Sequence, residues 1–147
     1  MDESDPNALT VEQALERILA ATAPVTGSES VGLEAALDRV LAEPVTARID
    51  VPPARNAAMD GYALAAADGK AGTTLRKAGV SAAGHPWDGR LGPGECIRIL
   101  TGAVVPDSAD TVVMQEHVTV DGEHVTLTAD ARPGAHVRNP GENTRAG

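Results

Sequence analysis

The sequence contains no phenylalanine, one tryptophan (Trp87) and one tyrosine (Tyr62), so aromatic rings cannot form its core. Valine, leucine, isoleucine and alanine must do so, within an apolar fraction of 42%. A chain of 147 residues is long enough to bury such a core. The 15 glycines and 10 prolines indicate many turns and short elements instead of a helical bundle.

Cysteine and lysine are also scarce. Cys96 is the only cysteine, so no internal disulfide can form, which fits a reducing cytosol. Lys70 and Lys77 are the only lysines and the net charge is −9, which argues against nucleic acid as a partner because such binding needs a basic face. No apolar run approaches the ~20 residues that span a bilayer, and residues 1–7 lack the features of a signal peptide. We therefore expect a cytoplasmic protein that does not contact a membrane.

Two segments near the N-terminus have helical periodicity. After an expected disordered lead at residues 1–8, Thr10 and Gln13 have the spacing of a capping box. Apolar residues follow at helical spacing as far as Pro24, and a second such stripe lies in residues 33–41 and ends at Pro44. Residues 9–44 are therefore predicted to form two amphipathic helices. Each is too short to be stable alone, so its stripe must pack on the other helix, on the rest of the chain or on a second copy.

Residues 45–137 have the pattern of a β-rich domain. Short β-branched runs predict strands at residues 75–80, 96–100 and 111–114. The runs 118–120 and 125–127 flank an Asp-Gly pair, which predicts a hairpin. The fold class expected is α+β, with two N-terminal amphipathic helices followed by a twisted, partly barrel-like β body.

An Asp-Gly pair also marks a predicted tight turn at residues 59–62. Gly61 can adopt positive φ, and its missing side chain lets a ligand or another backbone come close. The Asp60 carboxylate would lie at that turn, available for chemistry. The alternative is an Asx turn, in which Asp60 binds its own backbone.

The segment Thr101-Gly102-Ala103 follows a predicted strand. A hydroxyl and free backbone N–H groups at a strand end can hold an oxyanion. The alternative is an ordinary strand-to-loop turn. On the strand itself, Arg98 is expected to be exposed or salt-bridged, and Cys96 to be a small core residue.

Other polar residues have weaker patterns. Gln115 and Glu116 end the next strand, where they either face a cleft or form a polar pair at the sheet edge. Trp87 is expected to anchor a loop against the core. The histidines lack the spacing of zinc ligands and are interpreted as surface or loop residues. They are His85, His117, His124 and His136.

Taken together, the motifs resemble the N-terminal half of the molybdopterin molybdotransferases, the MoeA and gephyrin E-domain family. The likeness runs from about Leu9 to the last residue. The matching segments are LEAALDRVLAEP (33–44), AMDGYA (58–63), LGPGECIRILTGA (91–103) and ADTVVMQE (109–116).

The resemblance implies an enzyme that inserts molybdate into adenylylated molybdopterin with the help of Mg²⁺. Asp60 and Thr101 match functional residues of the family and are expected to be catalytic. Asp60 would position metal or substrate, and Thr101 would hydrogen-bond an anion. Gly61 and Gly102 are expected to contact substrate. A hard cation held by carboxylates would let an acidic protein bind anionic substrates.

The resemblance also implies a homodimer, with molybdopterin adenylyltransferase and molybdoenzymes as further partners. Residues 138–147 should return toward the helical part, because the helical domain of the family is discontinuous in sequence. Two departures stand out: Ala57 replaces a usual serine, and the closing GENTRAG lacks the Glu-Asp that normally follows.

The family's pterin-binding domain and C-terminal β domain have no counterpart in these residues. We therefore expect a chain truncated before the pterin-binding domain, with no turnover on its own. The second hypothesis is a non-catalytic dimerisation and interaction module derived from that family.

Overall fold

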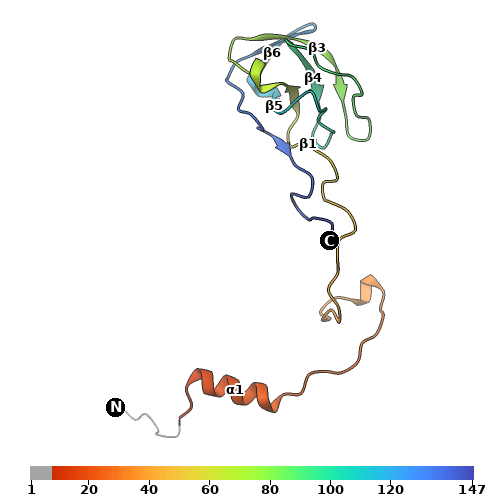
Figure 1. Cartoon of the computed structure of the whole chain (residues 1–147), viewed down its shortest axis with the longest axis vertical. Coiled ribbons are helices and arrows are strands. Elements are labelled where there is room, and N and C mark those ends of the chain that lie inside the picture. Colours follow the sequence, from red (N-terminus) through yellow and green to blue (C-terminus); the bar gives the residue numbers. More distant parts are fainter. Residues whose placement is uncertain (1–7) are drawn as a thin grey trace, which may run out of the picture. The chain divides into compact units, whose positions relative to one another are not determined.

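The computed structural model describes residues 8–147, which fall into two compact units, one ending at Pro44 and the other comprising Val45–Gly147 (Figure 1). The expected disordered lead, residues 1–8, lies outside the described residues apart from Ala8. Within the described range, no helix is both long enough and apolar enough to cross a bilayer.

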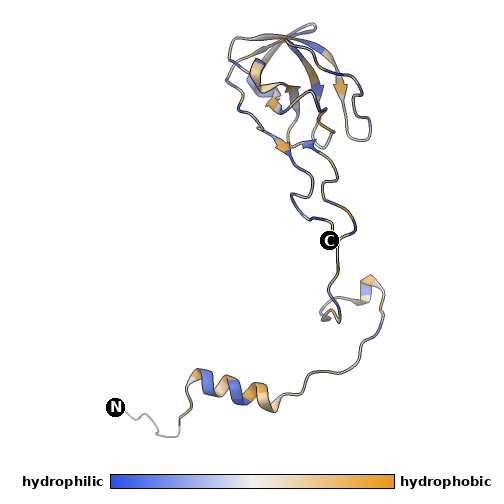
Figure 2. Ribbon diagram, viewed as in Figure 1, coloured by the Kyte–Doolittle hydropathy of each residue, from blue (hydrophilic) through white to orange (hydrophobic). Residues whose placement is uncertain are grey.

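The first unit contains the helix α1 (Val11–Ala21). The predicted capping box at its start is confirmed. Thr10 Oγ1 accepts from the Gln13 amide at 3.2 Å, and Gln13 Oε1 accepts from the Thr10 amide at 3.1 Å. Apolar and polar residues alternate along the helix (Figure 2). The apolar ones are nevertheless exposed, since Leu15 is 55% and Leu19 64% exposed.

The prediction of a second amphipathic helix is wrong. Residues 33–44 contain a single 3-10 turn, Leu33–Ala35, and the chain then turns at Asp38, whose φ of 63° is left-handed. Leu37 and Val40 are 82% and 95% exposed, so the stripe packs on none of the residues that the structure describes. A short helix without such a partner is marginal in water, and helical spacing alone does not stabilise it. The described chain is therefore mostly β with one α-helix.

The second unit is built on a curled six-stranded sheet, which Figure 1 shows as a partly closed barrel. The strand order is β5-β2-β4-β3-β7-β6, in which only β3 and β4 run parallel. The strands are β2 (Gly61–Leu64), β3 (Thr74–Ser81), β4 (Glu95–Ile99), β5 (Thr111–Met114), β6 (Val118–Asp121) and β7 (His124–Leu127). The predicted strands 75–80, 96–100 and 111–114 and the hairpin are thus confirmed, and so is the twisted β body.

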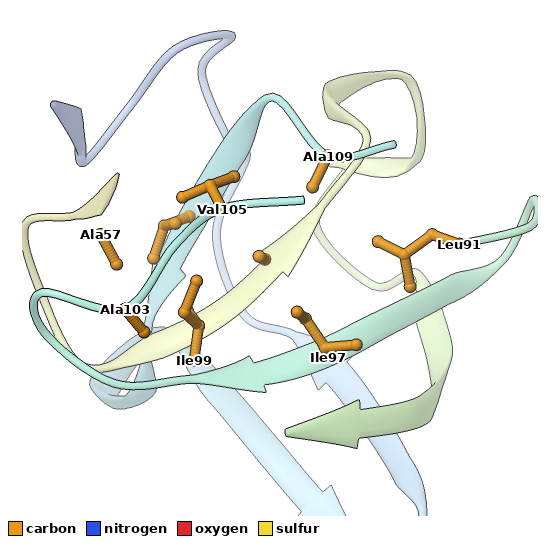
Figure 3. Packing of buried hydrophobic residues seen from close by; sticks show 9 residues of the cluster. Ala57, Leu91, Ile97, Ile99, Ala103, Val105 and Ala109 are labelled. Atoms are coloured by element: carbon orange, nitrogen blue, oxygen red, sulfur yellow. The ribbon is translucent and has the colours of Figure 1, made fainter. Parts of the chain in front are cut away.

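Each face of this sheet carries a cluster of buried side chains. On one face Ile97 and Ile99 of β4 pack in a cluster with Val112 of β5 (Figure 3). On the other face Cys96 packs with Leu64, and with further residues of β3, β5 and β7. Apart from Tyr62 and Cys96, the buried hydrophobic residues are aliphatic, in keeping with the absence of phenylalanine.

Burial makes Cys96 a poor nucleophile, as expected from the sequence. Its side chain is inaccessible, and desolvation raises the pKa of the thiol to about 11. Because only the thiolate reacts, this shift alone lowers the reactive fraction about 100-fold at neutral pH. We expect native protein to react with a thiol-specific dye only at its unfolding rate, and urea-unfolded protein to react at once. Rapid labelling of native protein would contradict the burial of Cys96.

Two paired chain segments, which we call the neck, lie at one end of the second unit. It consists of residues 47–57 and 137–147, and contains a two-stranded sheet of β1 (Asn56–Ala57) and β8 (Val137–Arg138). The two segments also pair beyond these strands. The Val51 amide donates to the Thr144 carbonyl at 2.8 Å, and the Gly147 amide donates to the Ala47 carbonyl at 3.1 Å. Residues 138–147 thus belong to the second unit, and their expected return toward the helical part stays a prediction.

Candidate functional site

Asp60 and Thr101 are brought together by the pairing of β2 with β4. Asp60 directly precedes β2 and Thr101 follows β4, and because these strands are antiparallel the two residues meet at one end of the sheet. Thr101 donates twice to Asp60 Oδ1, from its amide at 2.7 Å and from its hydroxyl at 2.6 Å. The carboxylate is therefore held across two strands, and its observed partners are not those of an Asx turn.

These bonds keep Asp60 ionised. The Thr101 hydroxyl, and next the Thr101 amide, hold the pKa of the Asp60 carboxyl below its ordinary value. Partial desolvation opposes this shift, and the positive charge of Arg98 adds to it. An ionised carboxylate with one oxygen engaged keeps its second oxygen available for a cation or a proton donor.

We expect replacement of Thr101 by valine to reduce stability at neutral pH more than in acid. The pKa of Asp60 is depressed in the folded state, so its contribution is fully present above the ordinary carboxyl range of about 4. That contribution disappears as the pH falls through the folded pKa. Urea unfolding of Thr101→Val and of the original chain at pH 7 and pH 3 should therefore give a larger difference at pH 7.

Thr119→Val is the matched control, since Thr119 lies exposed on β6. Glu95 and Asp130 also have depressed pKa values, through the Gly92 and Ala71 amides respectively, so acid will weaken every variant. Only the difference between Thr101→Val and Thr119→Val reports on Asp60. Equal differences at the two pH values would refute the coupling of Thr101 to the Asp60 charge.

The two glycines of the site have different structural roles. Gly61 lies in extended backbone within β2, and a Cβ atom there would stand 1.9 Å from the Val113 carbonyl oxygen. The close approach that its missing side chain permits is thus to the neighbouring strand. Gly102 is exposed and has a left-handed φ of 81°, a conformation that glycine adopts without strain.

The backbone amides of the 101–103 turn all have partners within the chain. The Thr101 amide donates to Asp60. The Gly102 amide donates to the Ala57 carbonyl at 2.8 Å, and the Ala103 amide donates to the Leu100 carbonyl at 2.9 Å. The free amides expected for an oxyanion site are therefore not found, and the polar groups open to a ligand are the second Asp60 oxygen and the Thr101 hydroxyl.

Arg98 is a part of this site that the sequence did not indicate. It is half-buried and makes no salt bridge with any described residue, contrary to expectation. Its Nη1 donates to the Gly61 carbonyl at 3.0 Å, and its Nη2 donates to Gln115 Oε1 at 2.7 Å. The guanidinium also lies over the ring of Tyr62, 5.4 Å from its centroid. The one available signal was its alternation with Ile97 and Ile99, which places it on the opposite face of β4.

Gln115 joins this group through its backbone as well. It begins the 3-10 turn Gln115–His117 that follows β5, and its amide donates to the Asp60 carbonyl at 3.1 Å. Its side-chain amide donates to Glu116 Oε1 at 3.3 Å. The polar pair expected at this strand end is thus present, and it stands directly beside Asp60.

Asp60 is half-buried and Thr101 is exposed, so the pair lies at the surface. One hollow of about 510 Å³ is lined by residues 87–90 and 104–108, and another of about 510 Å³ lies along residues 112–114 and 129–136. Neither is lined by Asp60 or Thr101. Within residues 8–147 no three histidine, cysteine or acidic side chains are grouped as metal ligands. Asp60 could therefore give a metal ion a single carboxylate ligand, and other ligands would have to come from elsewhere.

Comparison with known proteins gives a consistent result. Residues 9–147 match the family model described as the MoeA N-terminal region, domains I and II. A molybdopterin molybdenumtransferase of Haemophilus influenzae is 36% identical over 140 residues, which is 95% of this chain and 35% of the relative. One from a Nostoc species is 39% identical over 116 residues, covering 76% of this chain and 27% of the relative.

A solved structure is also similar. It is the molybdopterin biosynthesis MoeA protein of Pyrococcus horikoshii, which superimposes with a TM-score of 0.81 at 32% sequence identity. The match covers 92% of this chain and 37% of that one. The chain thus spans about a third of the length of the relatives that it matches.

Proposed function

We infer the function from one premise, which is that this chain belongs to the MoeA N-terminal family, domains I and II. We propose that it supplies one wall of the active site of a molybdopterin molybdenumtransferase, which inserts molybdate into adenylylated molybdopterin. The name of the reaction comes from the relatives, which are about three times as long as this chain. Turnover by these residues alone is not proposed.

The observation that carries this proposal is the bonding of Thr101 to Asp60 at the joined ends of β2 and β4. The family resemblance points to both residues, and their hydrogen bonds join them in one unit at the surface. A carboxylate fixed in this way, ionised and with one oxygen free, is suited to hold a cation against an anionic substrate.

Mg²⁺ is the cation that we propose. It is commonly bound by one or two carboxylates together with water and substrate phosphates, so a single carboxylate suffices on this wall. Asp60 would be that ligand. When bound, Mg²⁺ would offset the negative charge of the protein toward molybdate and phosphate.

Thr101 then has two successive roles in the proposal. In the free protein its hydroxyl donates to Asp60. Once a cation shares the Asp60 charge, the hydroxyl can turn to donate to an oxyanion of the substrate. Gly102 would allow this approach, because it is exposed and has no side chain.

We further propose that the protein acts in the cytoplasm as a homodimer. Support comes from the exposed stripe of α1, where Val11 is 80% and Ile18 61% exposed, a surface that a second copy would bury. The same stripe supports the second candidate, a non-catalytic interaction module. Molybdopterin adenylyltransferase and molybdoenzymes stay predicted partners. A chain that stays monomeric in sedimentation velocity at concentrations up to about 100 μM would contradict the dimer.

The function is tested by calorimetric titration of the chain with adenylylated molybdopterin, with and without Mg²⁺ and molybdate. Micromolar, Mg²⁺-dependent binding that is lost in Asp60→Asn is expected. Asp121→Asn, an exposed carboxylate at the end of β6, is the control and should bind as the original chain does. Binding that survives Asp60→Asn, or no binding at millimolar ligand, would refute this wall as a working half-site.

A further inference from the structure

We propose that Arg98 is a positioning residue for Asp60, because its guanidinium binds both Gly61, which follows Asp60, and Gln115, whose amide donates to the Asp60 carbonyl. The inference rests on the proposed function, because that function makes Asp60 the ligand of the cation. It concerns a residue that touches neither of the oxygens of that carboxylate in the structure.

The location of Arg98 makes this possible. It lies on β4, directly opposite Tyr62 of β2, and β2 is flanked by β4 on one side and β5 on the other. The guanidinium crosses the face of the Tyr62 ring and reaches Gln115, just beyond the end of β5. One side chain thus spans the ends of three strands.

Arg98 bonds two residues that adjoin the backbone of Asp60. The Asp60 carbonyl accepts from the Gln115 amide, and Arg98 holds the side chain of that same glutamine. Arg98 also holds the carbonyl of Gly61, the next residue after Asp60. On the other side of the carboxylate, Thr101 is three residues after Arg98 on the same chain segment. Asp60 is therefore held directly by Thr101, just after β4, at its carboxylate, and indirectly by Arg98 through Gly61 and Gln115.

Only arginine has the geometry for this. Its planar guanidinium directs two N–H groups to two acceptors at once, and it stacks on an aromatic ring. Lysine keeps the charge but concentrates it in a single ammonium group, which cannot reproduce the fixed spacing of the two bonds. The half-burial of Arg98 adds to the effect, because a partly desolvated cation is held firmly by its hydrogen bonds.

Amide hydrogen exchange on the 147-residue chain tests the proposal. The informative amides are those of Thr101 and Gln115, since both donate to Asp60. In Arg98→Lys we expect their protection to fall about tenfold, the size expected for losing one charge-assisted hydrogen bond. Gln115→Met, which removes the acceptor instead, should have the same local effect on Thr101.

The reference is the amide of Leu127, which donates to the Thr73 carbonyl in the core of the sheet. Protection of Leu127 should not change, whereas a purely stabilising role of Arg98 would lower the protection of all three amides together. Arg90→Lys is the control, an exposed arginine that should affect none of them. Unchanged protection at Thr101 and Gln115, or a uniform fall, would overturn the proposal.

A binding measurement separates this proposal from the function on which it rests. If the original chain binds adenylylated molybdopterin, Arg98→Lys should weaken that binding about tenfold, in line with a displaced Asp60. If the original chain does not bind, the proposed function fails, and a local loss of protection would still establish that Arg98 positions Asp60. Wild-type affinity in Arg98→Lys would overturn the positioning role.

Discussion

Replacing Gly61 by alanine is expected to destabilise the second unit strongly. The added Cβ would lie 1.9 Å from the Val113 carbonyl oxygen and 2.8 Å from its carbonyl carbon. Both are backbone atoms of the neighbouring strand, so no side-chain rotation can relieve the overlap. We expect a loss of more than about 3 kcal/mol, against a total of about 5–15 kcal/mol for a typical domain. Urea unfolding followed by far-UV circular dichroism would measure it.

Gly92→Ala is the matched control. The nearest atom to a Cβ at Gly92 is Glu95 Oε2 at 3.5 Å, an ordinary contact, and its φ is not left-handed. Alanine there should be neutral or slightly stabilising, because it restricts the unfolded chain. A Gly61→Ala protein as stable as Gly92→Ala would mean that β2 and β5 do not approach as closely as described.

Replacing Ile97 by alanine should cost about 2–5 kcal/mol, the range for truncating a fully buried aliphatic side chain. Ile97 is 0% exposed and lies at the centre of β4, with strands on both sides. The core contains no phenylalanine that could shift into the space. The cavity therefore has to be filled by small aliphatic side chains or left open, which favours the upper part of that range. Chemical unfolding at pH 7 would measure the loss.

Val120→Ala is the control for this change. Val120 also lies on a strand, β6, but it is 48% exposed, so its truncation should cost less than about 1 kcal/mol. A similar cost for the two substitutions would contradict the two-faced core. Because Ile97 does not reach Asp60, its variant also serves as a destabilised reference for binding measurements.

The strands that the sequence predicted are those whose own residues favour extended backbone. The β-branched runs of β4 and β5 needed no partner to be recognised. The hairpin was predicted from Asp121 and Gly122, although β6 extends through Asp121 and the turn residues are Gly122 and Glu123. Gly122 has a φ of 59°, which is why glycine marks this turn.

The inner strand β2 could not be predicted in the same way. Its sequence, Gly61–Leu64, begins with glycine and contains alanine, both poor strand formers. It forms because β4 and β5 offer hydrogen bonds on its two edges, and because Gly61 lets β5 approach. Neither cause is visible in local sequence. The second predicted helix shows the opposite case. Its apolar spacing is helical, but its stripe packs on no described residue, so the helix does not form.

The candidate site likewise contains residues that the sequence identified and contacts that it did not. Asp60 and Thr101 were identified from motifs, and the structure adds the physical link between them. The bonds of Arg98 and Gln115 to this site could not be predicted, because they depend on strand register between segments distant in sequence. Ala57, where the family usually has serine, is buried at 1% exposure, and its backbone pairs with Gly102 and Ala103. Its side chain faces the aliphatic core, so methyl is well accommodated there.

The neck has a consequence for the order of folding. Its two segments, 47–57 and 137–147, enclose the whole of the six-stranded sheet in the chain between them. Closing so long a loop costs entropy that a two-residue strand pair cannot repay alone. The neck therefore gains stability only after the sheet has already brought its ends together, while the local β6–β7 hairpin can form early. We infer that the neck is the last part of this unit to assemble and the first to open. Partial unfolding would then begin beside the Asp60 end of the sheet, because Ala57 of the neck pairs with Gly102 and Ala103.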